Sequence, residues 1–314
     1  MKDTILYGDC RKTLCALLSQ SARVCVTSPP YYGLRNYGGE DSQIGQEQTP
    51  EEFIDELVKV FREVRNVLTD DGTCWVNLGD SYYNYRPGRG QGLAKQTVSN
   101  TKQDLPDVCP RRGNRLEGLK EKDLIGIPWM FAFAMRADGW YLRQDIIWHK
   151  PNPMPESVRD RCTKAHEYIF LFSKNKKYFY DNEAIKEPAK DWGTRDRTNG
   201  KYHNEGSGLQ PHSGLTKSYA KKNKRSVWSV TKKPYKGAHF AVFPPELIEP
   251  CILAGSEKGD TILDPFMGSG TTAMVAKKLG RHYLGCELHE NYGDLIEERV
   301  LPYENRLEKF FEDS

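Results

Sequence analysis

The sequence predicts an α/β fold with a mostly parallel sheet. Strand-like and helix-like segments alternate over residues 3–82 and again towards the C-terminus. The apolar strand of residues 23–27 stops at Pro29-Pro30, and an amphipathic helix begins at Pro50. The chain has 314 residues, 38% of them hydrophobic, which is enough for a sizeable core.

The elements are expected in the following order. Strands cover residues 5–7 and 23–27. The helix from Pro50 carries apolar residues at helical spacing as far as Leu68, and Asp70-Asp71-Gly72 form a turn before a strand at 73–78. Later we expect a helix near 124–138, strands at 141–149 and 166–172, a helix around 245–254, a strand at 261–264, a helix at 271–279, a strand at 282–286 and a C-terminal helix.

Positive charge is concentrated in two irregular segments. Residues 83–122 hold nine Lys and Arg against four acids, and residues 186–236 hold thirteen against four, with Trp and Tyr interleaved. The rest of the chain is net acidic by eleven charges, so the formal charge of +3 conceals this division. Lysine-rich loops are often only solvated surface, but two of them inserted into an α/β fold favour contacts with nucleic-acid phosphates.

Composition argues against several classes of protein. No run of about 18 apolar residues is present, so we expect no membrane-spanning helix. Residues 1–4 lead directly into a strand, which argues against a signal peptide. The eight cysteines lack paired spacing and form no cluster with histidine, so we expect reduced thiols, a cytoplasmic location and no metal site.

The strongest local signal is a glycine loop after an apolar strand. The strand of residues 261–264 ends in Asp264, the loop contains Gly268-Ser269-Gly270, and Thr271 opens the next helix. Glycines allow a ligand to approach the backbone closely, and the helix N-terminus offers free N–H groups. Glu287 ends the following strand, 23 residues after Asp264, where a carboxylate is placed to bind ribose hydroxyls.

This loop differs from two common nucleotide sites. No lysine follows the glycines, which excludes a phosphate-binding P-loop, and Ala273-Met274 stand where the dinucleotide fingerprint has its third glycine. Asp264-Pro265-Phe266 before the glycines favours instead a nucleoside with a cationic tail, because a carboxylate attracts an ammonium group. S-adenosyl-L-methionine fits that description.

A second candidate site lies where the strand of residues 23–27 ends. Ser28-Pro29-Pro30-Tyr31 follows Thr27, at the edge where α/β sheets place active sites. The prolines hold a rigid turn with outward carbonyls, Ser28 adds a hydroxyl and Tyr31 adds an aromatic face. Such a cluster can accept hydrogen bonds from an exocyclic amine while the ring stacks on the base. Taken alone, Pro-Pro-Tyr is better explained as a turn that ends a strand.

The two motifs together resemble those of the amino-methylating DNA methyltransferases. Ser28-Pro29-Pro30-Tyr31 comes first and residues 264–272 (DPFMGSGTT) come last, which is the order of the beta group of that family. The resemblance covers nearly the whole chain apart from the two basic segments. It implies a seven-stranded, mostly parallel sheet with helices on both faces, S-adenosyl-L-methionine as cofactor and double-stranded DNA as substrate.

Further segments resemble elements of the family. Tyr7-Gly8-Asp9-Cys10 is similar to the segment whose acid contacts the cofactor's adenine, and residues 239–247 are similar to the stretch at its methionine end. Residues 145–153 and 166–172 resemble two strands that frame the target-base pocket. The resemblance implies a cofactor site made of Asp9, Cys10, Thr27, Phe243, Asp264, Pro265, Phe266, Gly268, Ser269, Gly270, Thr271 and Glu287.

The expected chemistry is direct methyl transfer to the exocyclic amine of a flipped base. Ser28 and the Pro29 carbonyl would accept hydrogen bonds from the amine and aim its lone pair at the methyl group, and Tyr31 would stack on the base. Pro30 completes the catalytic tetrapeptide. In the family, serine at this place is commoner among cytosine-N4 enzymes and Asp or Asn among adenine-N6 enzymes. Cytosine N4 is therefore expected, with adenine N6 as the alternative.

Three other interpretations were weighed against this one. Pro250-Cys251 resembles the nucleophile of cytosine-C5 methyltransferases, but those enzymes place the cofactor loop well upstream of it, so we expect no covalent intermediate. RNA and protein-glutamine methyltransferases usually carry the cofactor loop first and Asn in place of Ser28. A DNA-binding module without catalysis would need neither motif.

The domain organisation follows from the motifs. Residues 1–185 form the catalytic part of the methyltransferase domain, with the basic insert at about 83–122. Residues 186–236 form the target recognition region, and residues 237–314 form the cofactor-binding part of the same domain. A homodimer and a cognate restriction endonuclease stay open as partners, the first because several members of the family dimerise.

Overall fold

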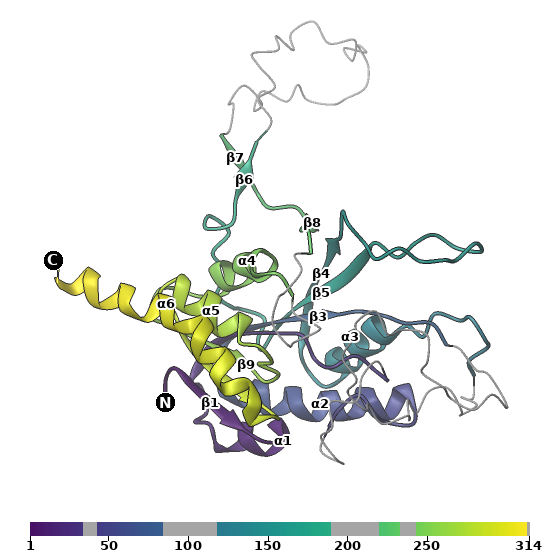
Figure 1. Cartoon of the computed structure of the whole chain (residues 1–314), viewed down its shortest axis with the longest axis horizontal. Coiled ribbons are helices and arrows are strands. Elements are labelled where there is room, and N and C mark those ends of the chain that lie inside the picture. Colours follow the sequence, from purple (N-terminus) through teal and green to yellow (C-terminus); the bar gives the residue numbers. More distant parts are fainter. Residues whose placement is uncertain (34–42, 84–117, 190–219, 233–242, 313–314) are drawn as a thin grey trace, which may run out of the picture.

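The computed structural model describes residues 1–33, 43–83, 118–189, 220–232 and 243–312. Its centre is an eight-stranded sheet in the order β1-β10-β9-β2-β3-β5-β4-β8 (Figure 1). The first five strands of that order are parallel: β1 (Thr4–Tyr7), β10 (His282–Glu287), β9 (Thr261–Asp264), β2 (Ala22–Thr27) and β3 (Leu68–Leu78). β5 (His166–Ser173) is antiparallel to both neighbours, β3 and β4 (Tyr141–His149).

The predicted α/β fold is confirmed, with one strand more than the seven expected. The additional strand is β8 (Val227–Ser229), which pairs parallel with β4 and belongs to the segment predicted as the recognition region. The Trp148 indole N–H donates to the Val230 carbonyl (2.9 Å), and this bond holds the edge strand in place. A strand of three residues shows too little alternation to be detected in a sequence.

The turn expected at residues 70–72 is an irregularity inside β3. Ala22 of β2 pairs with Leu68, but Val24 pairs with Thr73, so the intervening residues of β3 have no matching partners. A Cβ on Gly72 would lie 2.9 Å from the carbonyl oxygen of Arg23, which explains the glycine. The polar Asp-Asp-Gly sequence therefore marks a break in pairing rather than the start of a strand.

Helices cover both faces of the sheet (Figure 1). α2 (Pro50–Val67) and α3 (Ile127–Ala137) pack on one face, and α4 (Pro245–Gly255) and α5 (Thr271–Lys278) on the other. Side chains alternate along the strands accordingly, because Cys25 and Phe170 join the α2 side of the core while Val24 and Ile169 join the α4 side. The sheet is thus buried on both faces, and its edges are left for function.

The remaining elements connect these layers. α1 (Cys10–Thr13) and the 3-10 helix η1 (Leu14–Ala16) follow β1, and η4 (Glu290–Tyr292) leads into α6 (Gly293–Glu312), which packs on α5. α2 begins with a capping box in which Thr49 and Glu52 exchange hydrogen bonds of 3.1 Å. No helix in the described ranges is long and apolar enough to cross a membrane.

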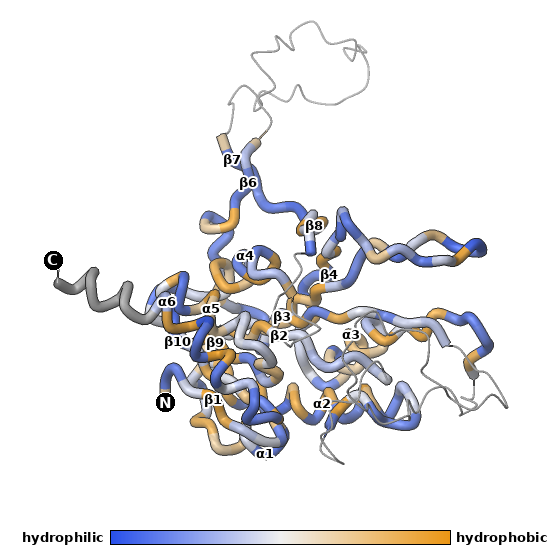
Figure 2. Tube along the Cα trace, in the orientation of Figure 1, coloured by the Kyte–Doolittle hydropathy of each residue, from blue (hydrophilic) through white to orange (hydrophobic). Residues whose placement is uncertain are grey.

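A small second sheet stands away from the main one (Figure 1). It pairs β6 (Glu187–Pro188) antiparallel with β7 (Lys221–Lys222). The segment that joins β7 to β8 is mostly hydrophilic (Figure 2). Parts of both basic segments lie outside the described residues. These parts are residues 190–219 and 233–236 of the predicted recognition region and residues 84–117 of the first basic insert.

Candidate active site

The two predicted motifs meet where the parallel strands end, at a boundary that we call the carboxyl edge. β2 ends at Thr27, β9 at Asp264 and β10 at Glu287. β5 runs in the opposite direction, so its first residues, His166 and Glu167, lie at the same edge. The fold therefore brings Thr27 and Asp264 together although 237 positions separate them in the sequence.

Asp264 links the two motifs directly. Its Oδ1 accepts hydrogen bonds from the Thr27 hydroxyl (2.6 Å) and from Phe266 N (3.0 Å), and its Oδ2 accepts one from the Thr272 hydroxyl (2.6 Å). Asp264 is only 1% exposed. Burial raises the pKa of Asp264 to about 6, although the hydrogen bonds from Thr27 and Thr272 oppose the rise. This carboxylate thus ties the end of β2 to the start of the glycine loop.

The glycine loop delivers an uncapped helix N-terminus to the edge. Gly270 is the N-cap of α5, with φ at +77° and no side chain to cap the free N–H groups. A Cβ on Gly270 would lie 3.0 Å from Ile296 of α6, so both space and conformation require glycine. The Thr271 hydroxyl is buried and has no hydrogen-bond partner among the described residues. An orphaned hydroxyl beside free N–H groups fits a polar ligand at this loop.

Glu287 faces the same loop from the end of β10. Its Oε2 accepts a hydrogen bond from Gly268 N (2.7 Å), and its Oε1 accepts one from His289 N (3.0 Å). Burial raises the pKa of Glu287. Each carboxylate oxygen can accept a second hydrogen bond, so Glu287 keeps the capacity to bind hydroxyl groups of a ligand.

Ser269 and Asp9 are engaged within the protein. The Ser269 hydroxyl and carbonyl accept hydrogen bonds from Arg299 of α6 (2.7 and 2.9 Å), which holds the glycine loop on that helix. Asp9 caps α1 by accepting from Arg11 N (2.9 Å) and pairs with the Arg11 guanidinium (2.8 Å), which also reaches Glu56 of α2 (2.5 Å). Burial would raise the pKa of Asp9, but the hydrogen bonds from Arg11 outweigh it and lower that pKa.

The other predicted cofactor residues surround this loop. Cys10 is buried at the start of α1, and burial raises the pKa of its thiol. Pro265 is buried, and Phe266 is half-buried against the α2 side of the core. Phe243 is half-buried against the α4 side, while residues 239–242 of the same predicted segment lie outside the described residues.

The tetrapeptide presents two acceptors that no described residue uses. Ser28 is half-buried, and its hydroxyl makes no hydrogen bond with any described residue. The Pro29 carbonyl likewise accepts no backbone N–H from the described part of the chain. Pro29 is buried and Pro30 half-buried, so the turn that carries these acceptors is fixed. An incoming amine could therefore donate to both oxygens without displacing a protein contact.

Tyr31 is held by a buried ion pair whose two residues lie in the segments expected to frame the target-base pocket, although the sequence did not predict their contact with Tyr31. Its hydroxyl donates to Glu167 Oε2 (2.8 Å), and the other carboxylate oxygen is paired with Lys150 at the end of β4. Asn77 of β3 donates to the Tyr168 carbonyl (3.0 Å) beside this pair. Although burial opposes it, the contacts with Lys150 and Tyr31 lower the pKa of Glu167. The carboxylate is therefore charged at neutral pH.

The ring of Tyr31 is also fixed by its contact with Gly79. It lies against Gly79, where an added Cβ would stand only 2.6 Å from Tyr31 Cε2. Glycine at position 79 thus leaves room for the aromatic ring. The available signals in the sequence were a lone acid, Glu167, in an otherwise apolar strand and a glycine directly after β3.

Cys251 lies outside this arrangement. It faces the core from α4, is 1% exposed, and its Sγ contacts the Leu247 carbonyl one turn earlier (3.8 Å). Burial raises the pKa of the Cys251 thiol, which disfavours the thiolate form. In the described ranges, no three His, Cys, Asp or Glu side chains are grouped so that they could hold a metal ion.

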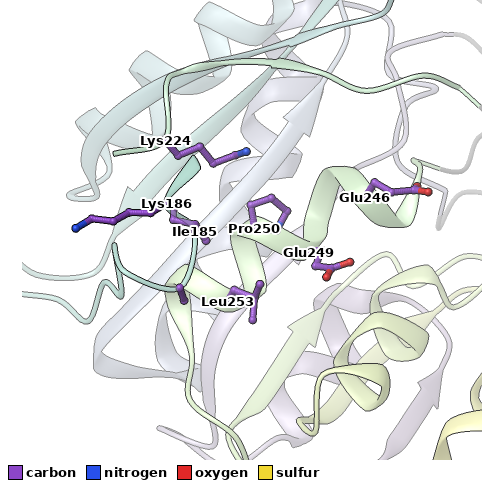
Figure 3. Close-up of a pocket in the computed structure, with 8 residues that line it drawn as sticks. Ile185, Lys186, Lys224, Glu246, Glu249, Pro250 and Leu253 are labelled. Carbon is purple, nitrogen blue, oxygen red and sulfur yellow. The ribbon is translucent and has the colours of Figure 1, made fainter. Parts of the chain in front are cut away.

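A surface pocket of about 230 Å³ lies beside α4, away from the predicted residues. Figure 3 shows Lys186 and Lys224 on one side of it and Glu246 and Glu249 of α4 on the other. None of the residues predicted for the catalytic or cofactor site lines this pocket. It is therefore not part of the candidate active site.

Comparisons with known proteins identify the family of the chain. A family model described as DNA methylase (N6_N4_Mtase) matches residues 22–298. The chain is 47% identical over 297 residues to the type II methyltransferase M.SmaI of Serratia marcescens, covering 95% of this chain and 90% of that protein. It is 46% identical to M.XycI of Xanthomonas campestris pv. cyanopsidis, covering 95% and 87%.

Two solved structures share the fold. One is the cytosine-N4-specific PvuII DNA methyltransferase, with a TM-score of 0.62 and 18% identity, covering 95% of this chain and 86% of that one. The other is a protein of Thermus thermophilus solved with S-adenosyl-L-methionine, with a TM-score of 0.57 and 24% identity, covering 95% and 93%. At these identities the two likenesses concern the fold alone.

Proposed function

The chain belongs to the family of amino-methylating DNA methylases, and from that premise we infer that its target is the exocyclic N4 amine of cytosine. It is a site-specific DNA methyltransferase that depends on S-adenosyl-L-methionine. The DNA-binding module and the RNA or protein-glutamine methyltransferase are thereby set aside. Ser28 carries the choice of base, because serine at this place is commoner among cytosine-N4 enzymes of the family. Adenine N6 is the alternative.

The residues of the carboxyl edge fit the cofactor. S-adenosyl-L-methionine supplies a methyl group that its sulfonium centre already activates. In our proposal Glu287 accepts the ribose hydroxyls, Asp264 attracts the ammonium group, and the orphaned Thr271 hydroxyl binds a polar group of the same molecule. Asp9 and Cys10, at the end of β1, adjoin the adenine.

The tetrapeptide orients the amine. The Ser28 hydroxyl and the Pro29 carbonyl accept hydrogen bonds from its two N–H groups, which shifts the nitrogen from planar towards tetrahedral and directs its lone pair at the methyl group. As the N–C bond forms, the bond from the methyl group to sulfur breaks, the cofactor leaves as a thioether, and the nitrogen then loses one proton. Tyr31, fixed by Glu167 and Gly79, stacks on the flipped base. Because Cys251 is buried away from the edge, it does not act as a nucleophile on the ring.

Nucleoside analysis tests the choice of base. Plasmid DNA of mixed sequence is incubated with the protein and methyl-labelled S-adenosyl-L-methionine, digested to nucleosides and analysed by mass spectrometry. We expect N4-methylcytosine, and Ser28→Ala should reduce its formation at unchanged cofactor affinity. N6-methyladenine in its place would overturn the cytosine assignment and leave the rest of the proposal standing.

We propose further that residues 186–236 recognise the target sequence and that the enzyme works in the cytoplasm as a homodimer beside a cognate restriction endonuclease. The type II names of its relatives support the endonuclease. Exchanging residues 186–236 for the matching segment of a relative of different specificity should change the methylated sequence. Light scattering should give a molar mass in solution twice that of one chain. A mass equal to that of one chain would refute the homodimer.

A further inference from the structure

The loop between β4 and β5 leaves the sheet beside the tetrapeptide, and beyond Lys150 and its neighbours the functional assignment does not use it. We call residues 150–165, between β4 and β5, the β4–β5 loop. His149 at the end of β4 pairs with His166 at the start of β5, and both lie at the carboxyl edge. Glu167, the next residue, accepts the hydrogen bond from Tyr31. Figure 1 shows the loop projecting away from the body at this edge.

The β4–β5 loop is braced rather than loose. Asn152 exchanges two hydrogen bonds with Lys232, one in each direction (3.0 and 3.1 Å). The Arg161 guanidinium stacks over the Tyr82 ring at 3.9 Å, and the Lys164 ammonium donates to the Asp80 carbonyl (2.7 Å). A loop held in this way loses little further conformational entropy when it contacts a partner.

The loop exposes a large apolar side chain. Met154 is 78% exposed, the highest value among the large apolar side chains in the described part of the chain. Pro153 and Pro155 flank it and restrict the backbone on both sides. Arg159, also exposed, makes no hydrogen bond or ion pair with the described residues and is available to a phosphate. An exposed apolar group and an exposed cation in one loop suit a partner surface that has both stacked bases and charged phosphates.

Methylation of a base inside a duplex creates such a surface. The target base leaves the stack to reach Ser28 and Tyr31, and its departure opens a gap between the neighbouring base pairs. Proteins that unstack DNA insert apolar side chains, methionine and proline among them, between base steps. The unbranched, polarisable methionine side chain adapts well to an irregular gap of this kind.

We propose that the β4–β5 loop contacts the DNA at the target and that Met154 fills the space left by the flipped base. Arg159 binds a phosphate beside that space. This inference rests on the proposed methylation of a flipped base at the carboxyl edge. It assigns to residues 150–165 a DNA contact that lies outside both basic segments predicted from the sequence.

Substitution of Met154 tests the inference. The duplex carries the mapped recognition sequence, with a fluorescent cytosine analogue in place of the target base to report unstacking. Met154→Ala should reduce the fluorescence increase on binding and lower kcat/KM for the unmodified duplex about tenfold, because the empty gap favours restacking. Met154→Leu should restore most of both signals, since it fills the same space.

Leu18→Ala is the matched control. Leu18 is an apolar side chain of similar exposure (71%), but it precedes β2 and so lies at the opposite edge of the sheet. It should behave as wild type, and cofactor affinity should be unchanged in all three variants. Wild-type fluorescence and kcat/KM for Met154→Ala, or a defect that Met154→Leu fails to restore, would overturn the inference. A wild-type protein that methylates no DNA would instead refute the proposed function.

Discussion

The Tyr31 hydroxyl donates a hydrogen bond to the Glu167 carboxylate across 2.8 Å and thereby joins the tetrapeptide to β5. Lys150 pairs with the same carboxylate and keeps it charged and in place. Glu167 touches neither the amine nor the methyl group in our proposal. It is a positioning residue whose effect on the reaction passes through the ring of Tyr31.

We predict that Tyr31→Phe and Glu167→Gln each lower kcat about tenfold, because a hydrogen bond to a charged group is worth about 1.5–3 kcal/mol. Cofactor affinity should not change. The double variant should be no slower than the slower single variant, since both substitutions act on the same charged hydrogen bond: phenylalanine lacks the donor, and glutamine lacks the negative charge of the acceptor. Steady-state kinetics on a duplex that carries the recognition sequence gives kcat for the two single variants and the double variant.

Glu183→Gln serves as the control for the Glu167 series. Glu183 forms an ion pair with Lys186 (2.5 Å) but is largely exposed, so its loss should change neither kcat nor stability measurably. Strictly additive effects of Tyr31→Phe and Glu167→Gln would show that Glu167 acts by a route other than the Tyr31 hydroxyl. Glu167→Ala is a poorer choice, because it leaves the buried Lys150 without its partner.

Asp264 should make stability depend on pH in a defined window. Its pKa is about 6 in the folded protein against an ordinary value of 3.8, so the folded state binds this proton more tightly than the unfolded state. Its contribution is complete below about pH 4 and is lost as the pH rises through 6. Asp264→Asn removes the titration. The free energy of unfolding of wild type, taken relative to the variant, should therefore fall by about 2 kcal/mol from pH 4.5 to 7.5.

Urea unfolding followed by circular dichroism gives these free energies at each pH. Every other carboxylate is common to the two proteins, so its titration cancels in the difference. A difference that stays constant between pH 4.5 and 7.5 would mean that Asp264 titrates alike in the folded and unfolded chains. In that case its hydrogen bonds from Thr27 and Thr272 would fully compensate its burial.

Glu287 should control the affinity for the cofactor. In Glu287→Gln a neutral amide replaces the carboxylate that accepts hydrogen bonds from Gly268 N and His289 N. A ribose hydroxyl bound at this position would likewise donate to a neutral group instead of a charged one, which weakens its hydrogen bond. We expect the dissociation constant for S-adenosyl-L-methionine to rise about tenfold, with DNA affinity unchanged. Isothermal titration calorimetry measures the dissociation constant for the cofactor. The control is Glu290→Gln, because Glu290 is exposed and lies only three residues further along the chain. Equal dissociation constants for Glu287→Gln and wild type would remove Glu287 from the cofactor site.

The carboxyl-edge position of Ser28 and Asp264 could be predicted because each stands at the end of a short apolar strand. In a parallel sheet the ends of such strands meet at one edge whatever their order. The two motifs could therefore be predicted to lie at the same edge without knowing which strands are neighbours. The hydrogen bond between Thr27 and Asp264 depends on β2 lying beside β9, which the sequence pattern does not encode.

Residues 166–172 were expected to frame the target-base pocket, but the contact of Glu167 with Tyr31 could not be predicted, for the same reason. Glu167 becomes a partner of Tyr31 only through the register in which Leu78 of β3 pairs with Tyr168 of β5. Pairing of Glu167 with Lys150 needs the neighbouring register of β4. An exposed methionine also looks like any other apolar residue until its position relative to the active site is known.

Cys251→Ser should retain full activity. The thiol is buried in α4, its pKa is raised by burial, and it does not lie at the carboxyl edge. A serine hydroxyl can donate to the Leu247 carbonyl as the thiol does, so we expect a loss of only about 1 kcal/mol in the free energy of unfolding. Methylation assays and urea unfolding measure the two quantities. A variant that is folded but inactive would overturn direct transfer in favour of a covalent intermediate.

The salt dependence of DNA binding should identify which cations face the duplex. Arg159 of the β4–β5 loop and Lys232, which follows β8, are both exposed and lie at the carboxyl edge, where the loop and Lys232 are joined through Asn152. Neutralising both to Gln should weaken binding and lower the slope of log K against log salt by about 1 to 2, since each lost phosphate contact removes about 0.9. Cofactor affinity should be unchanged.

The control is the replacement of Lys176 and Lys177 by Gln, which removes the same charge. Both lysines are exposed at the opposite edge of the sheet, beyond the end of β5. An equal change of slope in the two double variants would mean that only net charge matters and that the DNA does not approach the carboxyl edge in the way proposed.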